Sequence, residues 1–313
     1  MSEKAILFDG SRCTGCKGCQ VACKVWNELP TDLEPNSYEF KGSYQNPADL
    51  NSNTRLVMTF NELATDTQKR VGWCISRRAC QHCTNAGCAT VCPAGAISHD
   101  PETGFVVTDE SKCVGCQRCH EACPFDVPRY DNKDLRTTLN KCTGCADRVA
   151  NGMAPACVST CQPNALQFGD RDEMIKRAEE AVARLKERGY ADACVYGVDE
   201  MDGLHVIQVL KYGIEAAYQV ENPSLPPATA LTEIMKPVAA VGVGATVLGL
   251  GAMFGLAAGY KRDTLTYNRE TKDTLSRETG EVVKQGDPAD DRTIKEALTE
   301  NLPFGKGKED DHE

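Results

Sequence analysis

The stretch CTGCKGCQVAC at Cys13–Cys23 spaces four cysteines as CxxCxxCxxxC, and the stretch CVGCQRCHEAC at Cys113–Cys123 repeats this spacing. Of the eighteen cysteines in the chain, all but two fall into four quartets, and the second and fourth quartets have four and eleven residues between their second and third cysteines. The quartets are Cys13, Cys16, Cys19 and Cys23; Cys80, Cys83, Cys88 and Cys92; Cys113, Cys116, Cys119 and Cys123; and Cys142, Cys145, Cys157 and Cys161. Each quartet supplies three cysteines and a more remote fourth.

The CxxCxxCxxxC spacing is typical of proteins that bind cubane iron-sulfur clusters, where three thiolates bind one cluster and the fourth binds its neighbour. Four quartets therefore predict four 4Fe-4S clusters, with the sixteen cysteines as iron ligands. Structural zinc is an alternative, but it needs only four ligands and has no use for a third cysteine two residues after the second. Disulfide frameworks use dispersed cysteines. Cys74 and Cys194 stand outside the quartets, and we expect them to be small buried apolar side chains.

The charge of the chain argues against nucleic acid as a partner. Its 313 residues carry a formal net charge of -10. An oxidised cubane with four thiolates carries about -2, so four clusters add roughly -8. Nucleic-acid phosphates require a basic surface, and the sequence has no stripe of Lys and Arg.

Two segments of the chain repeat one another. Ala5–Cys19 (AILFDGSRCTGCKGC) and Phe105–Cys119 (FVVTDESKCVGCQRC) share an apolar strand, an Asp, a Ser two residues later and the cysteine run. This similarity indicates a duplicated unit. Glycines inside the ligand loops allow the backbone to approach a cluster closely.

Six basic residues lie near the quartets. We expect each of them to neutralise cluster charge and to solvate a surface, and a shift in the potential of a neighbouring cluster is the alternative. They are Arg77, Arg78, Arg118, Arg129, Lys141 and Arg148.

The chain divides into five regions. Residues 1–169 form the four-cluster domain, with a polar insert at 24–79 that we interpret as a surface segment, either packed on a partner or without a role of its own. Residues 170–219 form a capping region, in which EMIKRAEEAVARLKERG predicts an amphipathic helix ended by Gly189, and strands are expected near Ala193–Tyr196 and Leu204–Leu210. The others are a Pro-containing linker at 220–236, a span at 237–260 and a charged tail at 261–313.

The span is the second strong signal. Val238–Gly259 holds twenty-two residues without a charge, which predicts a single transmembrane helix. Glycines at four-residue spacing favour a partner helix in the bilayer. Basic residues crowd its carboxyl side, so the tail is expected in the cytoplasm and the cluster domain in the periplasm. Since MSEKAILFDG has no export signal, we expect export together with a partner. The span contains no histidine, so a membrane haem belongs to another subunit.

The chain resembles the iron-sulfur beta subunits of membrane-bound respiratory formate dehydrogenases, within the molybdopterin-oxidoreductase family. The similarity runs from the first quartet to the membrane span. The segments that carry it are CTGCKGCQVACKVWN at Cys13–Asn27, NPADL at Asn46–Leu50, CPFDVPRY at Cys123–Tyr130, KCTGCADRV with PACVSTCQPNAL within Lys141–Leu166, ERGYADACVY and GLHVIQVL.

This resemblance implies an α+β fold of two ferredoxin-like 4Fe-4S modules related by pseudo-twofold symmetry, plus one C-terminal transmembrane helix. It also implies that fourth cysteines are exchanged between quartets. The implied sets are Cys13, Cys16, Cys19 and Cys161; Cys142, Cys145, Cys157 and Cys23; Cys80, Cys83, Cys88 and Cys123; and Cys113, Cys116, Cys119 and Cys92. Because nitrate reductase relatives carry an aromatic residue in place of Cys116 and hold a three-iron cluster, all four clusters are expected here to be 4Fe-4S.

The resemblance further implies a non-catalytic electron-transfer subunit in anaerobic respiration. Its expected partners are a catalytic alpha subunit with molybdenum or tungsten bound to molybdopterin, a cytochrome b gamma subunit and the lipid bilayer of the inner membrane. No nucleophile–base pair, phosphate loop or dinucleotide motif indicates chemistry of its own. Two alternatives remain: the equivalent subunit of a hydrogenase or of a polysulfide, thiosulfate or arsenate oxidoreductase, and a membrane-tethered zinc-rich interaction module.

Overall fold

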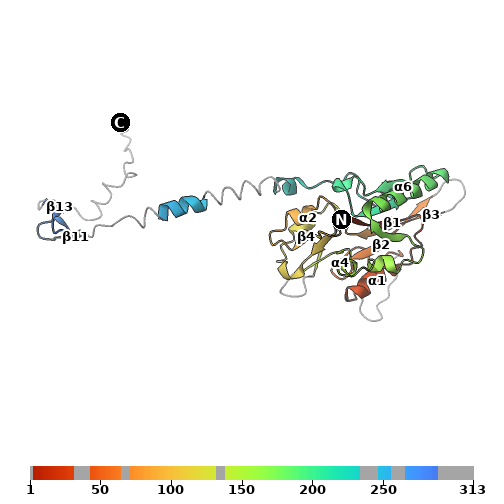
Figure 1. Cartoon of the computed structure of the whole chain (residues 1–313), viewed down its shortest axis with the longest axis horizontal. Helices are drawn as coiled ribbons and strands as arrows, with labels where there is room; N and C mark the ends of the chain where they lie inside the picture. The colour runs from red at the N-terminus through yellow and green to blue at the C-terminus, as the bar shows by residue number, and fades with distance from the viewer. Residues whose placement is uncertain are drawn as a thin grey trace, which may run out of the picture. The chain divides into compact units, whose positions relative to one another are not determined.

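The computed structural model describes residues 3–31, 43–64, 71–131, 138–232, 246–254 and 265–287. The chain separates into two compact units, Met1–Ala239 and Ala240–Glu313. The cysteine quartets all lie in the first unit. Figure 1 draws the helices and strands of both.

A four-stranded sheet in the order β8-β1-β10-β9 organises the first unit. Its strands are β1 (Lys4–Asp9), β8 (Leu166–Asp170), β9 (Cys194–Tyr196) and β10 (Val206–Leu210). β1 pairs in parallel with β10, with Ile6 opposite Val206, whereas β8 and β9 are antiparallel to their neighbours. The first strand of the chain is therefore central only because residues from the capping region, 170–219, lie beside it.

Helix α6 (Arg171–Glu187) covers one face of this sheet. Its buried face consists of Met174, Ala178, Ala181, Val182 and Leu185, which pack against Leu7 and Val209 of the sheet. Burying a large apolar side chain of this kind contributes about 1.5–3 kcal/mol. The chain leaves the helix through Gly189 at φ +91°. The predicted amphipathic helix and both predicted strands of this region are confirmed.

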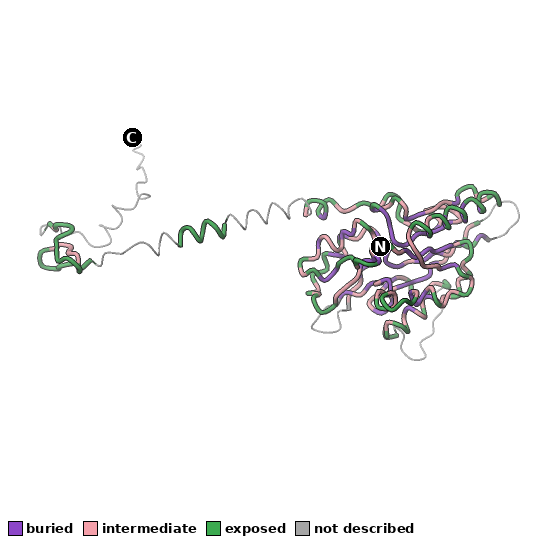
Figure 2. Tube along the Cα trace, in the orientation of Figure 1, coloured by how far each residue is buried: buried purple, intermediate pink, exposed green. Residues whose placement is uncertain are grey.

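The opposite face of the sheet packs on the cysteine-rich core. Successive side chains of a strand point to opposite faces, so Ala5 and Leu7 contact the α6 layer while Ile6 and Phe8 join a second core that contains six buried thiols. These thiols belong to Cys19, Cys23, Cys74, Cys80, Cys142 and Cys157. The buried segments in Figure 2 follow these central strands. The α6 core itself contains no cysteine.

The second half of the insert is a buried β-hairpin. Strands β2 (Leu56–Ala64) and β3 (Val71–Ala79) pair antiparallel, with Met58 opposite Arg77. Leu56, Val57 and Met58 are buried in the cysteine-rich core. The interpretation of the whole insert as a surface segment is therefore wrong for these residues, because its Asn- and Pro-rich first half obscured the apolar strand that follows.

The remaining elements of the first unit are short, and several of the helices contain cysteines of the quartets. The helices are α1 (Gly18–Trp26), α2 (Gly87–Thr90), α3 (Arg118–Glu121), α4 (Ala146–Ala150), α5 (Ala156–Ser159) and α7 (Gly213–Ala216), with 3-10 turns at Glu110–Lys112 and Glu200–Asp202. Two antiparallel ribbons pair β4 (Ile97–His99) with β5 (Val106–Thr108) and β6 (Arg129–Asp131) with β7 (Thr138–Asn140).

The second unit contains helical residues at 246–254 and a three-stranded meander. Its strands are β11 (Leu265–Tyr267), β12 (Thr274–Ser276) and β13 (Val282–Lys284). Among the residues that the structure describes, no helix has both the length and the apolar character to cross a bilayer. Most of the predicted span at 237–260 and of the tail at 261–313 lies outside the described residues.

Candidate iron-sulfur sites

The two repeated segments enter their cysteine runs through the same turn. After β1, the backbone N–H of Ser11 donates to Oδ1 of Asp9 at 3.0 Å, and the Ser11 hydroxyl donates to the same oxygen at 2.6 Å. After β5, the Ser111 N–H and hydroxyl donate to Asp109 at 3.1 and 2.5 Å. Such Asx turns reverse the chain locally. The duplicated unit predicted from the sequence is thus repeated at the level of individual hydrogen bonds.

Glycine stands before the second cysteine in three of the four candidate ligand loops, and in the other loop His82 stands there at φ +51°. Gly15, Gly115 and Gly144 have φ of +67°, +68° and +67°, in the left-handed region that disfavours a Cβ. At Gly144 a Cβ would also come within 2.3 Å of Phe105 Cδ2. The loop that carries Cys142 and Cys145 therefore requires glycine for both conformation and space.

Gly144→Ala is expected to lower the free energy of unfolding and the iron content. The left-handed conformation costs about 1–2 kcal/mol with a Cβ, and the overlap with Phe105 adds about 1–3 kcal/mol. Gly152 is the matched control, because its φ is +72° and no heavy atom of the described chain lies within 4 Å of an added Cβ. Urea unfolding and iron analysis measure both variants. Equal losses in Gly144→Ala and Gly152→Ala would contradict the steric argument.

The first group of thiols gathers around one cavity. Cys13, Cys16, Cys19 and Cys161 line it together with Phe8 and Met58. Burial raises the pKa of Cys13, and the charges of Cys161 and Cys16 raise it further. Three of these cysteines follow β1, and the fourth follows α5, 142 residues after Cys19. We name this set the Cys13 group.

The second group joins Cys23 to the last quartet. Desolvation raises the pKa of Cys23, and Cys142, Cys157 and Cys145 contribute next. Helix α1, which carries Cys23, packs against α5, which carries Cys157. We name Cys142, Cys145, Cys157 and Cys23 the Cys142 group.

The remaining cysteines form two groups in the same manner. Desolvation raises the pKa of Cys83, and the charges of Cys80, Cys123 and Cys88 raise it further. We name these four cysteines the Cys80 group. Desolvation likewise raises the pKa of Cys119, on which Cys92 and Cys116 also act. Cys113 packs against the small core that contains Cys119 and Cys92. Cys113, Cys116, Cys119 and Cys92 are the Cys113 group.

Electrostatic interactions between cysteines of different groups place the groups in one order. The charge of Cys157 raises the pKa of Cys19, after desolvation, to about 12. Burial raises the pKa of Cys80, and the charge of Cys142 adds to this effect. Burial likewise raises the pKa of Cys88, and the charge of Cys119 adds to it. The order is therefore the Cys13 group, the Cys142 group, the Cys80 group and the Cys113 group. Such a row suits the passage of electrons from one end to the other.

The donor set fits iron-sulfur clusters rather than free thiols. Burial raises the pKa of Cys145 to about 12 and that of Cys123 to about 11, so these thiols need a metal to become thiolates at neutral pH. Among the described residues, no three His, Cys, Asp or Glu side chains converge on one metal-ion position. A cubane does not require this convergence, because each thiolate binds a different iron at a different corner of the cluster.

Backbone amides donate to the sulfurs of two candidate ligands, each the last cysteine of its quartet. The N–H of Ala96 donates to Cys92 Sγ at 3.3 Å, and the N–H of Leu166 donates to Cys161 Sγ at 3.2 Å. The Tyr130 hydroxyl lies 2.7 Å from Cys119 Sγ. Hydrogen bonds to sulfur are one means by which a protein sets the potential of a cluster.

Two buried cations lie among the groups. Arg77 is 0 % exposed, and none of its guanidinium nitrogens has a hydrogen-bond partner within the described chain. Lys141 is also buried, and its Nζ donates to the carbonyls of Val106 at 2.6 Å and Cys142 at 3.1 Å. A buried charge without a counter-charge is strongly destabilising. Negatively charged clusters would supply that counter-charge, which supports the fit.

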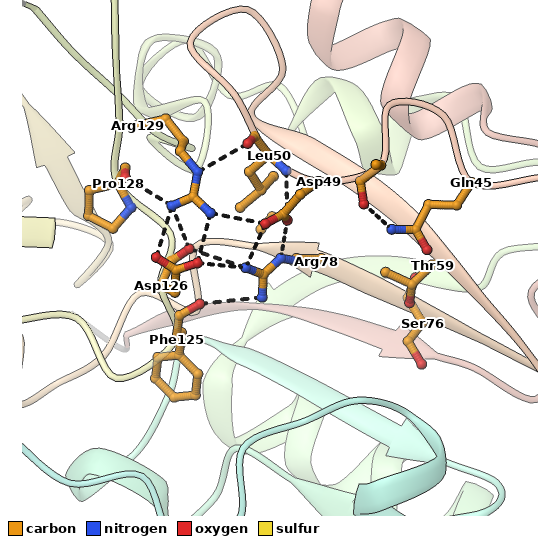
Figure 3. Close-up of polar contacts among 12 residues, drawn as sticks. Gln45, Asp49, Leu50, Thr59, Ser76, Arg78, Phe125, Asp126, Pro128 and Arg129 are labelled. Carbon is orange, nitrogen blue, oxygen red and sulfur yellow. Dashed lines mark hydrogen bonds and ion pairs between the residues drawn. The ribbon is translucent and has the colours of Figure 1, made fainter. Parts of the chain in front are cut away.

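A network of two arginines and two aspartates anchors the loop after Cys123 (Figure 3). Asp49 contacts Arg78 and Arg129, and Asp126 contacts the same two arginines at 3.2 and 2.8 Å. The N–H of Asp126 donates to the Cys123 carbonyl at 3.1 Å. The network thus joins the NPADL segment of the insert, β3 and the CPFDVPRY segment around a candidate ligand.

Asp126→Asn is expected to lower the free energy of unfolding by about 1 kcal/mol, because exposed ion pairs contribute about 0.2–1 kcal/mol each. Desolvation opposes ionisation, yet Arg129 and Arg78 hold the pKa of Asp126 below its usual range. A depressed carboxyl pKa stabilises the fold above the unfolded value of about 3.9 and loses this effect as the pH falls through the folded value.

The difference from the unmodified chain should therefore be constant above about pH 5 and shrink below that. Urea unfolding at several pH values measures it. Glu187→Gln, at the exposed end of α6, is the control and should change little. A difference that grows as the pH falls would contradict the ion-pair explanation.

The structure shows features that sequence reasoning missed. We expected each nearby basic residue to neutralise cluster charge and to solvate a surface, and the second part is wrong for Arg77 and Lys141, which are buried. Alternation of apolar and polar residues in VGWCISRRA (Val71–Ala79) was the available signal for a strand that turns Arg77 inward. Cys74 is buried and Cys194 is half-buried against the same core, and neither belongs to a thiol group.

The sequence is similar to those of known iron-sulfur proteins. A family described as a 4Fe-4S dicluster domain matches residues 71–171. The formate dehydrogenase iron-sulfur subunit of Haemophilus influenzae is 40 % identical over 250 residues, covering 79 % of this chain and 78 % of the relative. The iron-sulfur subunit of the nitrate-inducible formate dehydrogenase of Escherichia coli is 38 % identical, covering 80 % and 83 %. The beta subunit of formate dehydrogenase 2 of Nitratidesulfovibrio vulgaris is 37 % identical, covering 65 % and 93 %.

Buried thiols grouped around candidate cluster positions on an α+β fold define an iron-sulfur protein of the 4Fe-4S ferredoxin class. The class transfers electrons and performs no substrate chemistry of its own. Within it, the extent of the match settles the family: this protein belongs to the iron-sulfur subunits of formate dehydrogenases.

Proposed function

We propose that this chain relays electrons from a molybdopterin-containing catalytic subunit, with molybdenum or tungsten, through four 4Fe-4S clusters to a membrane cytochrome b and quinone. The observation that carries this proposal is the single row in which the four thiol groups succeed one another. The clusters, when bound, accept and release one electron at a time. The match of formate dehydrogenase subunits over about four-fifths of the chain favours formate as the source of electrons.

The ligands of each cluster are proposed to be one thiol group. Each group combines three cysteines of one quartet with the last cysteine of another, and the cavity of the Cys13 group supports this exchange. The repeated Asx turns support a fold of two ferredoxin-like modules related by pseudo-twofold symmetry. The chain itself contributes ligand positions, hydrogen bonds to sulfur and an apolar core that excludes water.

We further propose that residues 237–260 anchor the chain in the inner membrane, beside a cytochrome b subunit. In the helical residues 246–254, the large apolar side chains of Leu248 and Phe254 are 77 % exposed, which suits a lipid surface. The basic flank favours a cytoplasmic tail and periplasmic clusters. Protection of the cluster domain from protease added to spheroplasts would contradict this orientation.

Isolation of the native complex tests the function. Gentle detergent extraction should yield this chain with a molybdopterin subunit and a cytochrome, and the complex should reduce quinone with formate. The iron and acid-labile sulfide belonging to this chain should approach about sixteen each. A nickel-iron subunit would instead indicate a hydrogenase, and zinc without iron would indicate the interaction module. A colourless, folded and iron-free chain would refute the proposal.

A further inference from the structure

The hairpin β2–β3 lies over the Cys13 group and turns one arginine toward it. Met58 and Arg77 stand opposite one another in the hairpin, so their side chains share a face. Met58 lines the cavity of the Cys13 group. On the same face, Ile75 lies against Gly15 in the loop between Cys13 and Cys16, where an added Cβ would come within 3.1 Å of its Cδ1. This face of the hairpin therefore covers the first ligand loop.

Arg77 also lies beside the Cys142 group. Burial desolvates the Arg77 guanidinium, and its electrostatic partners are Cys142, Cys157, Cys19 and Cys23. One of these thiols belongs to the Cys13 group and three belong to the Cys142 group. Arg77 thus stands where the two groups adjoin.

The neighbouring residues Arg77 and Arg78 on β3 differ in the partners of their guanidinium groups. Arg78 points to the other face, where two aspartates bind it (Figure 3). Lys141 is buried, but backbone carbonyls accept its hydrogen bonds. The guanidinium of Arg77 has neither kind of partner within the described residues. Arg77 also lines a cavity of about 370 Å³, but the residue is 0 % exposed, so water in this cavity does not contact its guanidinium.

We propose that Arg77 is the shared counter-ion of the clusters bound by the Cys13 and Cys142 groups and raises the reduction potentials of both. The proposal rests on the four clusters of the proposed function. Reduction adds one negative charge to a cluster, and a fixed positive charge in a low-dielectric interior stabilises the reduced form more than the oxidised form. Because Arg77 adjoins both groups, its charge stabilises an electron on either of the two clusters between which the electron passes.

Removal of this charge gives the first test. In the purified complex, Arg77→Met is expected to lower two of the four reduction potentials, each by at least a tenfold change in the redox equilibrium, or about 59 mV for a one-electron couple. Redox titration followed by electron paramagnetic resonance measures all four. The shifted pair is assigned with Cys16→Ala and Cys145→Ala, which each remove one candidate ligand, from the Cys13 group and from the Cys142 group.

Arg118→Met is the matched control, since Arg118 lies between two ligands of the Cys113 group but is exposed. Solvent screens its charge, and its removal should shift no potential by as much as tenfold. Arg77→Lys keeps the charge and should recover at least half of the shift. Four assembled clusters with unchanged potentials in Arg77→Met, or a shift confined to the other two clusters, would overturn the proposal.

Loss of clusters in Arg77→Met is also decisive when Arg77→Lys is compared. If the lysine variant keeps four clusters and their potentials, the charge is required and the proposal stands. If the lysine variant loses them as well, the shape of the arginine is what matters, and the proposal fails. Failure of the proposed function is distinguished by the unmodified complex, which would then contain fewer than four titrating clusters.

Discussion

Cys161→Ala is expected to remove the same cluster as Cys13→Ala, although Cys161 lies only four residues after Cys157. The reason is spatial: Cys161 lines the cavity of the Cys13 group. The iron content should fall by about four of sixteen, and the same paramagnetic signal should disappear from both variants. Formate-dependent quinone reduction should fall about a hundredfold or more, beyond the 10- to 100-fold typical of changes outside the ligand shell.

Two further comparisons test whether the fourth ligand is exchanged between quartets. Cys157→Ala should instead lose the same cluster as Cys142→Ala. Both cysteines belong to the Cys142 group, where their charges add to the desolvation that raises the pKa of Cys23. Cys194→Ala, which changes a thiol outside the groups, should retain all the iron. Iron analysis and electron paramagnetic resonance of the purified complexes provide the measurement. If Cys161→Ala gave the spectrum of Cys157→Ala, the exchange of fourth ligands would be wrong.

Removal of iron with an oxidant and a chelator is expected to unfold the cysteine-containing cores while the α6 layer persists. Binding of structural metal contributes on the order of 10 kcal/mol to folding, and without clusters Arg77 is left as a buried charge. The core between α6 and the sheet contains no cysteine, whereas the other two cores depend on them.

Amide hydrogen exchange before and after iron removal measures this difference. Protection should be lost in β2–β3 and β4–β5 and largely kept in α6. The α6 helix therefore serves as an internal control within the same sample. Retention of full protection in β4–β5 would show that the fold does not depend on iron.

Much of the local structure could be predicted from the sequence because its signals are local. The period of the apolar residues in α6, the terminal Gly189 and the short strands after it are all encoded within a few residues. The duplicated Asp–Ser turns were visible for the same reason. The hairpin β2–β3 was missed because a polar stretch precedes it, and the parallel pairing of β1 with β10 because about 200 residues separate the strands.

The sequence by itself determined the number and spacing of the sixteen ligand candidates, since short loops fix three thiols of each set relative to one another. Tertiary structure alone decided which distant cysteine stands beside each triplet, because helix packing brings α1 against α5 and α2 against α3. It also decided the roles of Arg77 and Arg78. These neighbours are alike in the sequence, and only the register of the hairpin turns one toward the buried thiols and the other toward the aspartates, since alternate side chains of a strand face opposite sides.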